Sequence, residues 1–257
     1  MPPDQTRHDN ARPPDVTAPK RRRLLQVLPV AAILGATARA AAATTDLALS
    51  CDTTLGPALR AAARVYANVT GVMVNVFPTP PGLIVPQLQR QVQNDIVMTQ
   101  PATLAACVKA NVVAPDAPRG TWRNPLVVAV KRGAAPVLRV PTAASDPTPG
   151  SDMDGPAILA RLGLEHSARF GAIDTNTVAA LILSGIAQAG LLHMTDICAH
   201  SDLQVISTVP QDIHAPIAYS AAVTKLARRP DPARFVAFLL SPQATAVLAK
   251  SGLEAVS

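Results

Sequence analysis

The chain has 257 residues, of which 49% are hydrophobic, 16% charged and 3% aromatic, so it is long and apolar enough for one or two folded cores. Its net charge of +6 suggests a nucleic-acid partner, yet residues 1–43 hold seven of the 23 Lys and Arg residues and three of the 17 acidic ones. The remaining 16 basic and 14 acidic residues nearly balance, which removes the main support for nucleic-acid binding.

Residues 1–43 have the pattern of an export signal. The basic segment Lys20–Arg23 precedes an apolar run, Leu24–Leu34, which is too short to span a membrane, and small residues follow. This order predicts a signal peptide cleaved near residues 40–44, and hence a periplasmic protein. The pair Arg21-Arg22 also fits the twin-arginine pattern, so the export route stays open. The alternative is a basic arm on a cytoplasmic protein.

The next segment alternates strand and helix signals, beginning with Asp46–Ala63. Here a short apolar run meets a polar turn, Ser50 to Thr54, and a helical pattern begins at Leu55. The later strands and helices are predicted at Val72–Phe77, Leu83–Gln93, Asp95–Thr99 and Pro101–Ala110, with a loop at Pro78–Gly82. This β-α-β-α-β-α order predicts a parallel sheet covered by helices.

A second group of elements begins with a strongly apolar strand signal at Asn124–Lys131, and a Pro-rich connection then runs to about Pro149. Helices are predicted at 155–162, 175–189, 232–240 and 242–251, and strands at 190–194 and 203–208, and the segment 217–223 is again apolar. The last helix has a serine N-cap at Ser241, proline at its first position and Gly252 beyond its end.

Several motifs in this order resemble the periplasmic molybdate-binding proteins of ABC importers. They include Thr53-Thr54-Leu55 after the first strand and Gly190-Leu191-Leu192-His193-x-Thr195-Asp196 late in the chain. The resemblance covers roughly residues 46–253 and implies an α/β protein with the two-lobed type II periplasmic-binding fold. Each lobe would be a mainly parallel sheet flanked by helices. Lobe 1 would comprise residues 44–123 and 217–257, and lobe 2 residues 124–216.

The resemblance also implies where a tetrahedral oxyanion would bind, with His193 at the family's tyrosine position. The implied ligand residues are Thr53, Thr54 and Thr79 from lobe 1 and Ser151, Thr175 and His193 from lobe 2. Neutral hydroxyl and backbone N–H donors suit a desolvated dianion, because they stabilise negative charge and recognise its geometry. Histidine can donate as a tyrosine does, and better when protonated.

Two features depart from the family's pattern. Asp52 lies two residues from Thr54, where a carboxylate repels a dianion unless it points away. Pro80 and Pro81 occupy a loop that should offer backbone N–H groups, and proline has none. The resemblance therefore carries further for the fold than for the site.

The same residues have structural interpretations. Thr53, Thr54 and Thr175 could cap helices, and Thr79 could stabilise a turn. His193 ends an apolar strand, where a satisfied structural histidine is common. Each of these positions therefore keeps two interpretations, a ligand contact or a local structural role.

Other chemistries have weaker signals. The metal-binding residue types His193, Asp196, Cys198, His200 and His214 fit no standard metal spacing. Catalysis by Cys198 with His200, or by Ser50 with a histidine, lacks a supporting motif. The three cysteines, at positions 51, 107 and 198, are expected to be buried free thiols, with one disulfide as the alternative.

The sequence thus predicts an exported solute-binding receptor of an ABC importer that binds a tetrahedral oxyanion, molybdate or tungstate first, between its lobes. We expect no enzymatic activity, cofactor, metal or nucleic-acid partner, but an inner-membrane ABC permease as partner of a monomer. The alternative is an exported sensor or partner-binding module on the same fold, with a small organic acid, a metal ion or no ligand.

Overall fold

A computed structural model describes residues 46–90, 94–134, 142–145, 154–164, 169–172, 174–227 and 231–256. By its contacts the chain divides into two units, Met1–Ala41 and Ala42–Ser257, and all described residues belong to the second. The predicted export signal therefore lies outside the described residues.

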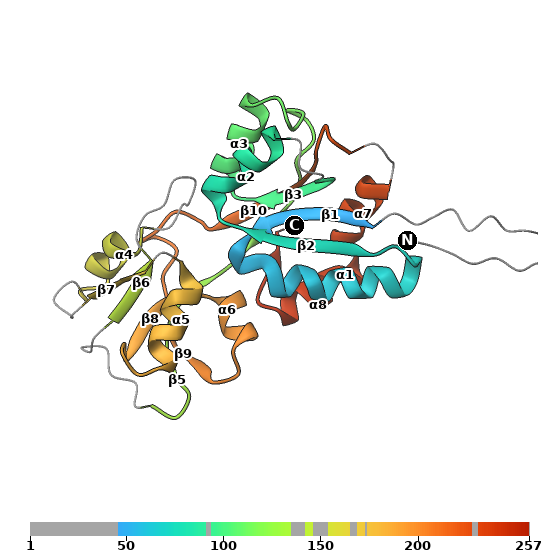
Figure 1. Cartoon of the computed structure of the whole chain (residues 1–257). Coiled ribbons are helices and arrows are strands. Elements are labelled where there is room, and N and C mark those ends of the chain that lie inside the picture. Colours follow the sequence, from blue (N-terminus) through green and yellow to red (C-terminus); the bar gives the residue numbers. More distant parts are fainter. Residues whose placement is uncertain are drawn as a thin grey trace, which may run out of the picture. The chain divides into compact units, whose positions relative to one another are not determined.

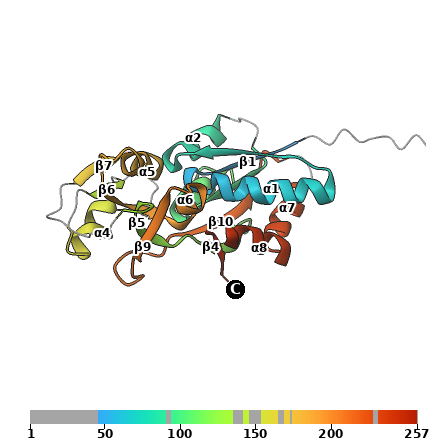
Figure 2. The same cartoon turned by 90° about the horizontal axis from the view of Figure 1, so that it is seen from below.

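The first sheet has six strands in the order β11-β4-β10-β3-β1-β2 (Figures 1 and 2). Their bounds are β1 Leu47–Asp52, β2 Val74–Thr79, β3 Ile96–Thr99, β4 Arg119–Arg123, β10 Ala218–Val223 and β11 Glu254–Ala255. The strand β1, next to the edge strand β2, pairs in parallel with β2 and β3, whereas β10 pairs antiparallel with β3 and β4. The carboxyl ends of β1, β2 and β3 therefore meet at one edge of the sheet.

Helices cover both faces of this sheet (Figure 1). One face packs on α1 (Gly56–Thr70), α7 (Asp231–Leu239) and α8 (Pro242–Lys250), and the other on α2 (Pro81–Gln89) and α3 (Pro101–Lys109). Alternation along β1 explains the layers, since Leu47, Leu49 and Cys51 all point into the first of these cores. In the described part of the chain, no single helix is both long and apolar enough to cross a membrane. The bent pair α7 and α8 meets these requirements of length and composition only when its two helices are taken together.

The second sheet has five strands in the order β7-β6-β8-β5-β9. Their bounds are β5 Leu126–Lys131, β6 Thr142–Ser145, β7 Arg169–Ala172, β8 Ala189–His193 and β9 Leu203–Thr208. Three helices accompany them: α4 Gly155–Arg161, α5 Thr175–Leu183 and α6 Met194–Ala199. Residues of β5, β8 and α5 share one apolar core, to which Val178 and Leu192 belong.

The two sheets confirm the predicted α/β fold class, and their pairing refines it. Parallel pairing is confined to β2-β1-β3 and β7-β6-β8, while β5, β9, β10, β4 and β11 pair antiparallel, so each sheet is mixed rather than mainly parallel.

The chain crosses from the first sheet to the second at Asn124 and Pro125, between β4 and β5. It returns through residues 209–217, between β9 and β10. The two crossings are bonded to each other, because Asn124 N donates to the carbonyl oxygen of Ile217 at 3.1 Å. One apolar core includes residues from both sheets, among them Leu49 and Leu191.

Candidate functional site

The carboxyl edge of the first sheet gathers polar side chains that are shielded from water. Asp52 ends β1, Thr79 ends β2 and Thr99 ends β3, and Asp52 lies opposite Thr79 in the strand register. All three are at most 3% exposed. Ligands of open α/β sheets bind at this edge, because strand ends and helix starts leave unpaired polar groups there.

The position of Asp52 two residues from Thr54 raised the question whether its carboxylate would repel an anion. In the structure this carboxylate is hydrogen-bonded within the protein. Asp52 Oδ1 accepts a hydrogen bond from Thr99 Oγ1 on the neighbouring strand. The parallel pairing of β1 with β3 brings these two side chains together. The sequence alone does not reveal which strands pair. The carboxylate is therefore part of a buried polar network at the base of the edge.

Thr54 lies in a single 3-10 turn, Thr53–Leu55, which joins β1 to α1. Its hydroxyl oxygen is buried and makes no hydrogen bond of normal geometry, so Thr54 is not a conventional helix cap. Beside it stands the hydroxyl of the fully buried Tyr219 on β10. Burial raises the pKa of Tyr219 well above its usual value, and the Asp52 and Asp196 carboxylates raise it further. The Thr54 and Gln100 side chains, which lie within hydrogen-bonding reach of the Tyr219 hydroxyl, lower this pKa.

These influences on Tyr219 come from both sheets, and they show which elements lie close together. Asp52 belongs to the first sheet and Asp196 to α6 of the second, and both carboxylates act on the one Tyr219 hydroxyl. The turn containing Thr54 also contacts α6 directly. The end of β1 and the start of α6 are therefore neighbours across the two sheets.

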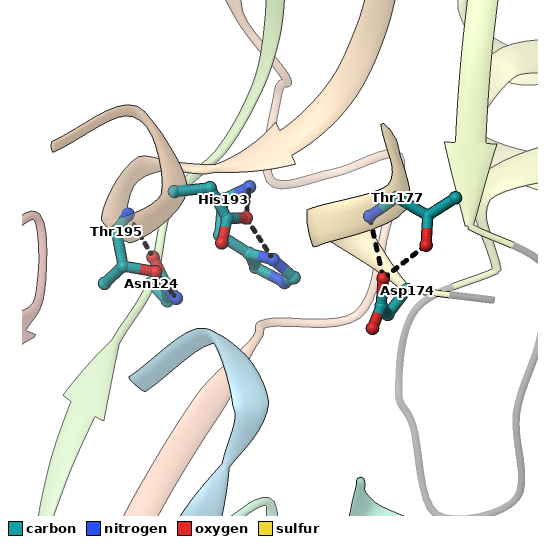
Figure 3. Close-up of polar contacts among 6 residues, drawn as sticks. Asn124, Asp174, Thr177, His193 and Thr195 are labelled. Atoms are coloured by element: carbon teal, nitrogen blue, oxygen red, sulfur yellow. Dashed lines mark hydrogen bonds and ion pairs between the residues drawn. The ribbon is translucent and has the colours of Figure 1, made fainter. Parts of the chain in front are cut away.

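His193 ends β8 and precedes α6, and it is only 4% exposed. Its backbone N donates to Asp196 Oδ2 at 2.9 Å, and its ring Nδ1 lies 3.3 Å from the same oxygen (Figure 3). Its Nε2 is buried without a hydrogen-bond partner. Asp196 thus fixes the orientation of the imidazole and leaves one ring nitrogen for another group.

Thr175 is the first residue of α5, and it too is 3% exposed. Asp174 caps this helix by accepting hydrogen bonds from Thr177 N and Thr177 Oγ1, both at 2.8 Å (Figure 3). The capping role suggested for Thr175 therefore belongs to Asp174. The Thr175 hydroxyl oxygen is buried and has no partner.

The described residues contain five buried side-chain polar atoms without a hydrogen-bond partner, and three belong to predicted ligand residues. These three are Thr54 Oγ1, Thr175 Oγ1 and His193 Nε2; the others are Trp122 Nε1 and His214 Nε2. The helix α6 contacts both the Thr54 turn and α5, and Figure 3 shows the imidazole between the start of α5 and the blue segment from the end of β1. Since an unpaired buried polar atom costs about 1–3 kcal/mol, three in neighbouring segments indicate a binding site.

The other predicted positions behave differently. Thr53 is half-buried at the start of the same turn, and Ser151 lies outside the described residues. The Thr79 hydroxyl donates to the carbonyl oxygen of Phe77 at 3.1 Å and lies 3.5 Å from Gln87 Oε1, so its hydrogen-bonding capacity is used locally. It lines a hollow together with Ser50, Arg60, Gln87 and Asn94.

The expected loop at Pro78–Gly82 is largely absent. Pro78 and Thr79 belong to β2, and Pro81 begins α2 with Pro80 as its N-cap. Proline is tolerated at both places, because β2 is an edge strand and the first helix position needs no N–H donor. This helix start therefore lacks two N–H groups that an anion could have used.

The described part of the chain gives no support to the metal site or to a pair of Ser50 with a histidine. No group of three His, Cys, Asp or Glu side chains there lies close enough to hold a metal ion. Ser50 Oγ donates to Asn94 Oδ1 at 2.8 Å, away from any histidine contact. All three cysteines are free; Cys51 and Cys107 are buried as expected, but Cys198 is exposed. Its position late in the short helix α6 places it on the solvent side.

The comparison with known families decides the class of the protein. The family model described as bacterial extracellular solute-binding protein matches residues 47–254, almost the whole described range. The chain belongs to this family. In solute-binding proteins the ligand is a small molecule, so the cluster of unpaired polar atoms at Thr54, Thr175 and His193 lies in a protein of the class that needs such a site.

Solved structures show the same fold for this solute-binding protein. The periplasmic molybdate-binding protein of Azotobacter vinelandii superposes with a TM-score of 0.69 at 19% identity, covering 82% of this chain and 99% of that one. PEB3 bound to L-phospholactate superposes with a TM-score of 0.66 at 15% identity, covering 81% and 99%. The resemblance to molybdate-binding proteins is thus confirmed in the fold, the type II periplasmic-binding fold.

One curated relative of this solute-binding protein has a different description. It is an aconitate isomerase of a Pseudomonas species, 24% identical over 219 residues, which cover 77% of this chain and 83% of the relative. Proteins similar to this chain therefore include both receptors and an isomerase.

Sequence reasoning missed two residues of the polar network, Thr99 and Tyr219. Thr99 ends the predicted strand Asp95–Thr99, and its position at a parallel strand end was a usable signal. Tyr219 lies within the apolar stretch of β10, and no sequence pattern separates its buried hydroxyl from a core aromatic.

Proposed function

We propose that this solute-binding protein is the exported receptor of an ABC importer and that it binds a tetrahedral oxyanion, molybdate or tungstate first. The observation that carries the proposal is the set of three buried polar atoms without partners, at Thr54, Thr175 and His193. A bound oxyanion has four acceptor oxygens and would pair all three groups at once.

The charge distribution is compatible with an anion, although two carboxylates lie nearby. Asp52 accepts a hydrogen bond from Thr99, and Asp196 accepts one from the backbone N–H of His193. Each acid therefore has donors of its own within the protein. What remains unpaired in the site are hydroxyl groups and one imidazole nitrogen, which recognise an oxyanion by geometry.

The family context supports the rest of the proposal. A receptor that closes on its ligand gives a membrane permease a signal to recognise, and the two crossings at Asn124 and Ile217 would be the hinge. Residues 1–43 supply the export signal, and the mature protein acts as a periplasmic monomer without a cofactor. Ligand binding and permease docking are then the only functions required of it.

Ligand binding is tested by thermal unfolding with molybdate, tungstate, sulfate and phosphate. A ligand that binds only the native state at about 100 times its Kd adds about 2.7 kcal/mol of stability, which raises the midpoint by about 5–10 °C for a chain of this size. A selective rise with one or more of these anions is expected. If none of them raises the midpoint while an organic acid or a divalent cation does, the oxyanion proposal is wrong.

Thr175→Val separates a ligand contact from a structural role. Because the Thr175 hydroxyl has no partner, its removal should leave the stability of the free protein unchanged or higher, and should weaken anion binding about 10- to 100-fold. Thr177→Val is the matched control on the same helical turn. This variant loses the hydrogen bond from the Thr177 hydroxyl to Asp174, so it should destabilise the protein by about 1 kcal/mol without weakening anion binding. The reverse pattern would contradict the assignment.

A second candidate is an isomerase acting on a small organic acid, as the name of the curated relative suggests. The observation in its favour is the His193–Asp196 pair, in which a carboxylate holds one ring nitrogen and the other stays unpaired, as a general base requires. Incubation with cis-aconitate and trans-aconitate, followed by chromatography, tests it. Interconversion that is lost in His193→Gln would replace the receptor proposal.

A further inference from the structure

The hollow at Thr79 is not explained by the oxyanion site. Its lining comes from β1, β2, α1 and α2 together with Asn94, and Figure 1 shows β2 with α1 on one side and α2 on the other. Its volume of about 500 Å³ lies within the range of pockets that hold small organic molecules. One tetrahedral oxyanion would leave most of this space empty, so the hollow has room for the carbon skeleton of a larger ligand.

The lining combines one cation with neutral polar groups. Ser50, Thr79 and Asn94 are each at most 3% exposed, and each is bonded to another protein group. In the described part of the chain, Arg60 is the one charged residue that lines the hollow, and no hydrogen bond or ion pair there holds its guanidinium. A free guanidinium beside a neutral polar floor attracts an acidic group of a ligand.

The Arg60 side chain is folded back toward the start of its own helix. Its Nη1 lies 3.3 Å from the position that a Cβ on Gly56 would occupy, and Cγ of Pro78 lies 2.7 Å from the same position. The helix itself does not stabilise a cation there, because α1 begins at Gly56 and the start of a helix is the positive end of its dipole. Burial raises the pKa of the Cys51 thiol and Asp52 raises it further, whereas Arg60 lowers it. The charge of Arg60 therefore acts at the carboxyl edge of the sheet.

The hollow and the oxyanion site adjoin the same turn between β1 and α1. Thr54 and Gly56 are two residues apart, so their Cα atoms are separated by at most about 7 Å. A ligand with an oxyanion group at Thr54 can therefore place a second acidic group at Arg60 through a short carbon chain. Phe77, which lines the hollow and is 50% exposed, would cover that chain and shield it from water.

We propose that the hollow is a subsite for a carboxylate of the ligand and that the Arg60 guanidinium binds this carboxylate, an inference that rests on the proposed function. The ligand is then an organic acid that carries a tetrahedral oxyanion group and a carboxylate, a few carbon atoms apart. The planar guanidinium suits a carboxylate, because its parallel N–H donors match the two carboxylate oxygens. Molybdate and sulfate occupy the oxyanion position alone and make no use of the subsite.

Isothermal titration calorimetry of the whole protein compares two ligands that differ only in the carboxylate. Phosphonopropionate carries it, propylphosphonate has a methyl group in its place, and molybdate and sulfate probe the oxyanion position by itself. We expect phosphonopropionate to bind at least about 10-fold more tightly than propylphosphonate, as for a hydrogen bond between charged groups. Equal affinity for the two phosphonates would overturn the inference, and binding of molybdate or sulfate would still support the proposed function. No binding of any of the four ligands would overturn both.

Variants give a second readout. Arg60→Gln should remove the preference for phosphonopropionate over propylphosphonate, and it should change the affinity for molybdate by less than about 3-fold, since only a distant surface charge is lost. Arg64→Gln, one turn later on α1 and outside the hollow, is the matched control and should keep the preference. Phe77→Ser should weaken both phosphonates alike and leave molybdate unaffected. A preference for phosphonopropionate that survived Arg60→Gln would show that another group binds the carboxylate and would overturn the inference.

Discussion

Gly252→Ala should lower the free energy of unfolding by about 3 kcal/mol or more. Gly252 follows α8 with a φ of +84°, and a Cβ built on it would lie 2.7 Å from the backbone carbon and oxygen of Met194 and 2.8 Å from Thr195 N. The strained backbone costs about 1–2 kcal/mol, and the overlap adds about 1–3 kcal/mol because the neighbouring atoms are backbone and cannot rotate away. Denaturant unfolding monitored by Trp122 fluorescence measures the loss.

Gly71→Ala is the matched control. Gly71 ends α1 with a φ of +74°, and nothing lies within 4 Å of a Cβ built there. Only the backbone strain applies, so the expected loss is about 1–2 kcal/mol. If the two variants lost equal stability, the close approach of Gly252 to the start of α6 would have no energetic importance.

Asn124→Ala should destabilise the protein by about 2–4 kcal/mol and also weaken anion binding. The Asn124 amide donates to Thr195 Oγ1 at 2.9 Å and accepts from Thr195 N at 3.2 Å, and both residues are 1% exposed (Figure 3). Truncation would leave two buried groups of Thr195 unpaired, at about 1–3 kcal/mol each. Thermal unfolding and anion titration of the same preparation measure both effects.

The control for this variant is Asn75→Ala. The Asn75 amide donates to Asp46 at 3.2 Å on the surface, so its loss should change stability by less than about 0.5 kcal/mol and leave anion affinity unchanged. If Asn124→Ala lost stability but kept its full affinity for the anion, the start of α6 would not be what positions His193.

Both predictions concern one structural feature, the fixation of the first turn of α6. Met194 N donates to the carbonyl oxygen of Pro125 at 2.8 Å, Thr195 is held by Asn124, and Gly252 packs against their backbone. Asn124 and Pro125 are also the first crossing between the sheets. Movement at that crossing would therefore reach His193 through hydrogen bonds rather than through soft apolar contacts.

Elements with strong local signals were predictable. The strand at 203–208 has the predicted bounds, and the last helix begins at Pro242 after the Ser241 N-cap, whose Oγ accepts from Ala244 N at 3.2 Å. Such elements depend on apolar periodicity and on side chains that bond their own backbone, and both lie within a few residues of each other.

Short elements escaped prediction. The strands β4, β6, β7 and β11 and the helix α6 have between two and six residues each, too few for a period to show. The expected helix at 175–189 ends instead at Leu183, because Ser184 and Gly185 close its last turn, with Gly185 at a φ of +79°. The stretch from there to Ala189 leads into β8.

By itself, the sequence determined the α/β class and the order of the main elements. The resemblance to molybdate-binding proteins pointed to Thr54, Thr175 and His193, and local patterns placed the two threonines near helix starts and His193 at the end of an apolar strand. Only the tertiary structure decided that one buried polar atom on each of these three side chains has no partner while the Thr79 hydroxyl has its own, that Asp52 bonds to Thr99, and that Asp52 and Asp196 both act on Tyr219. Those facts depend on which strands pair and which helices touch, and residues far apart in the chain set them through packing.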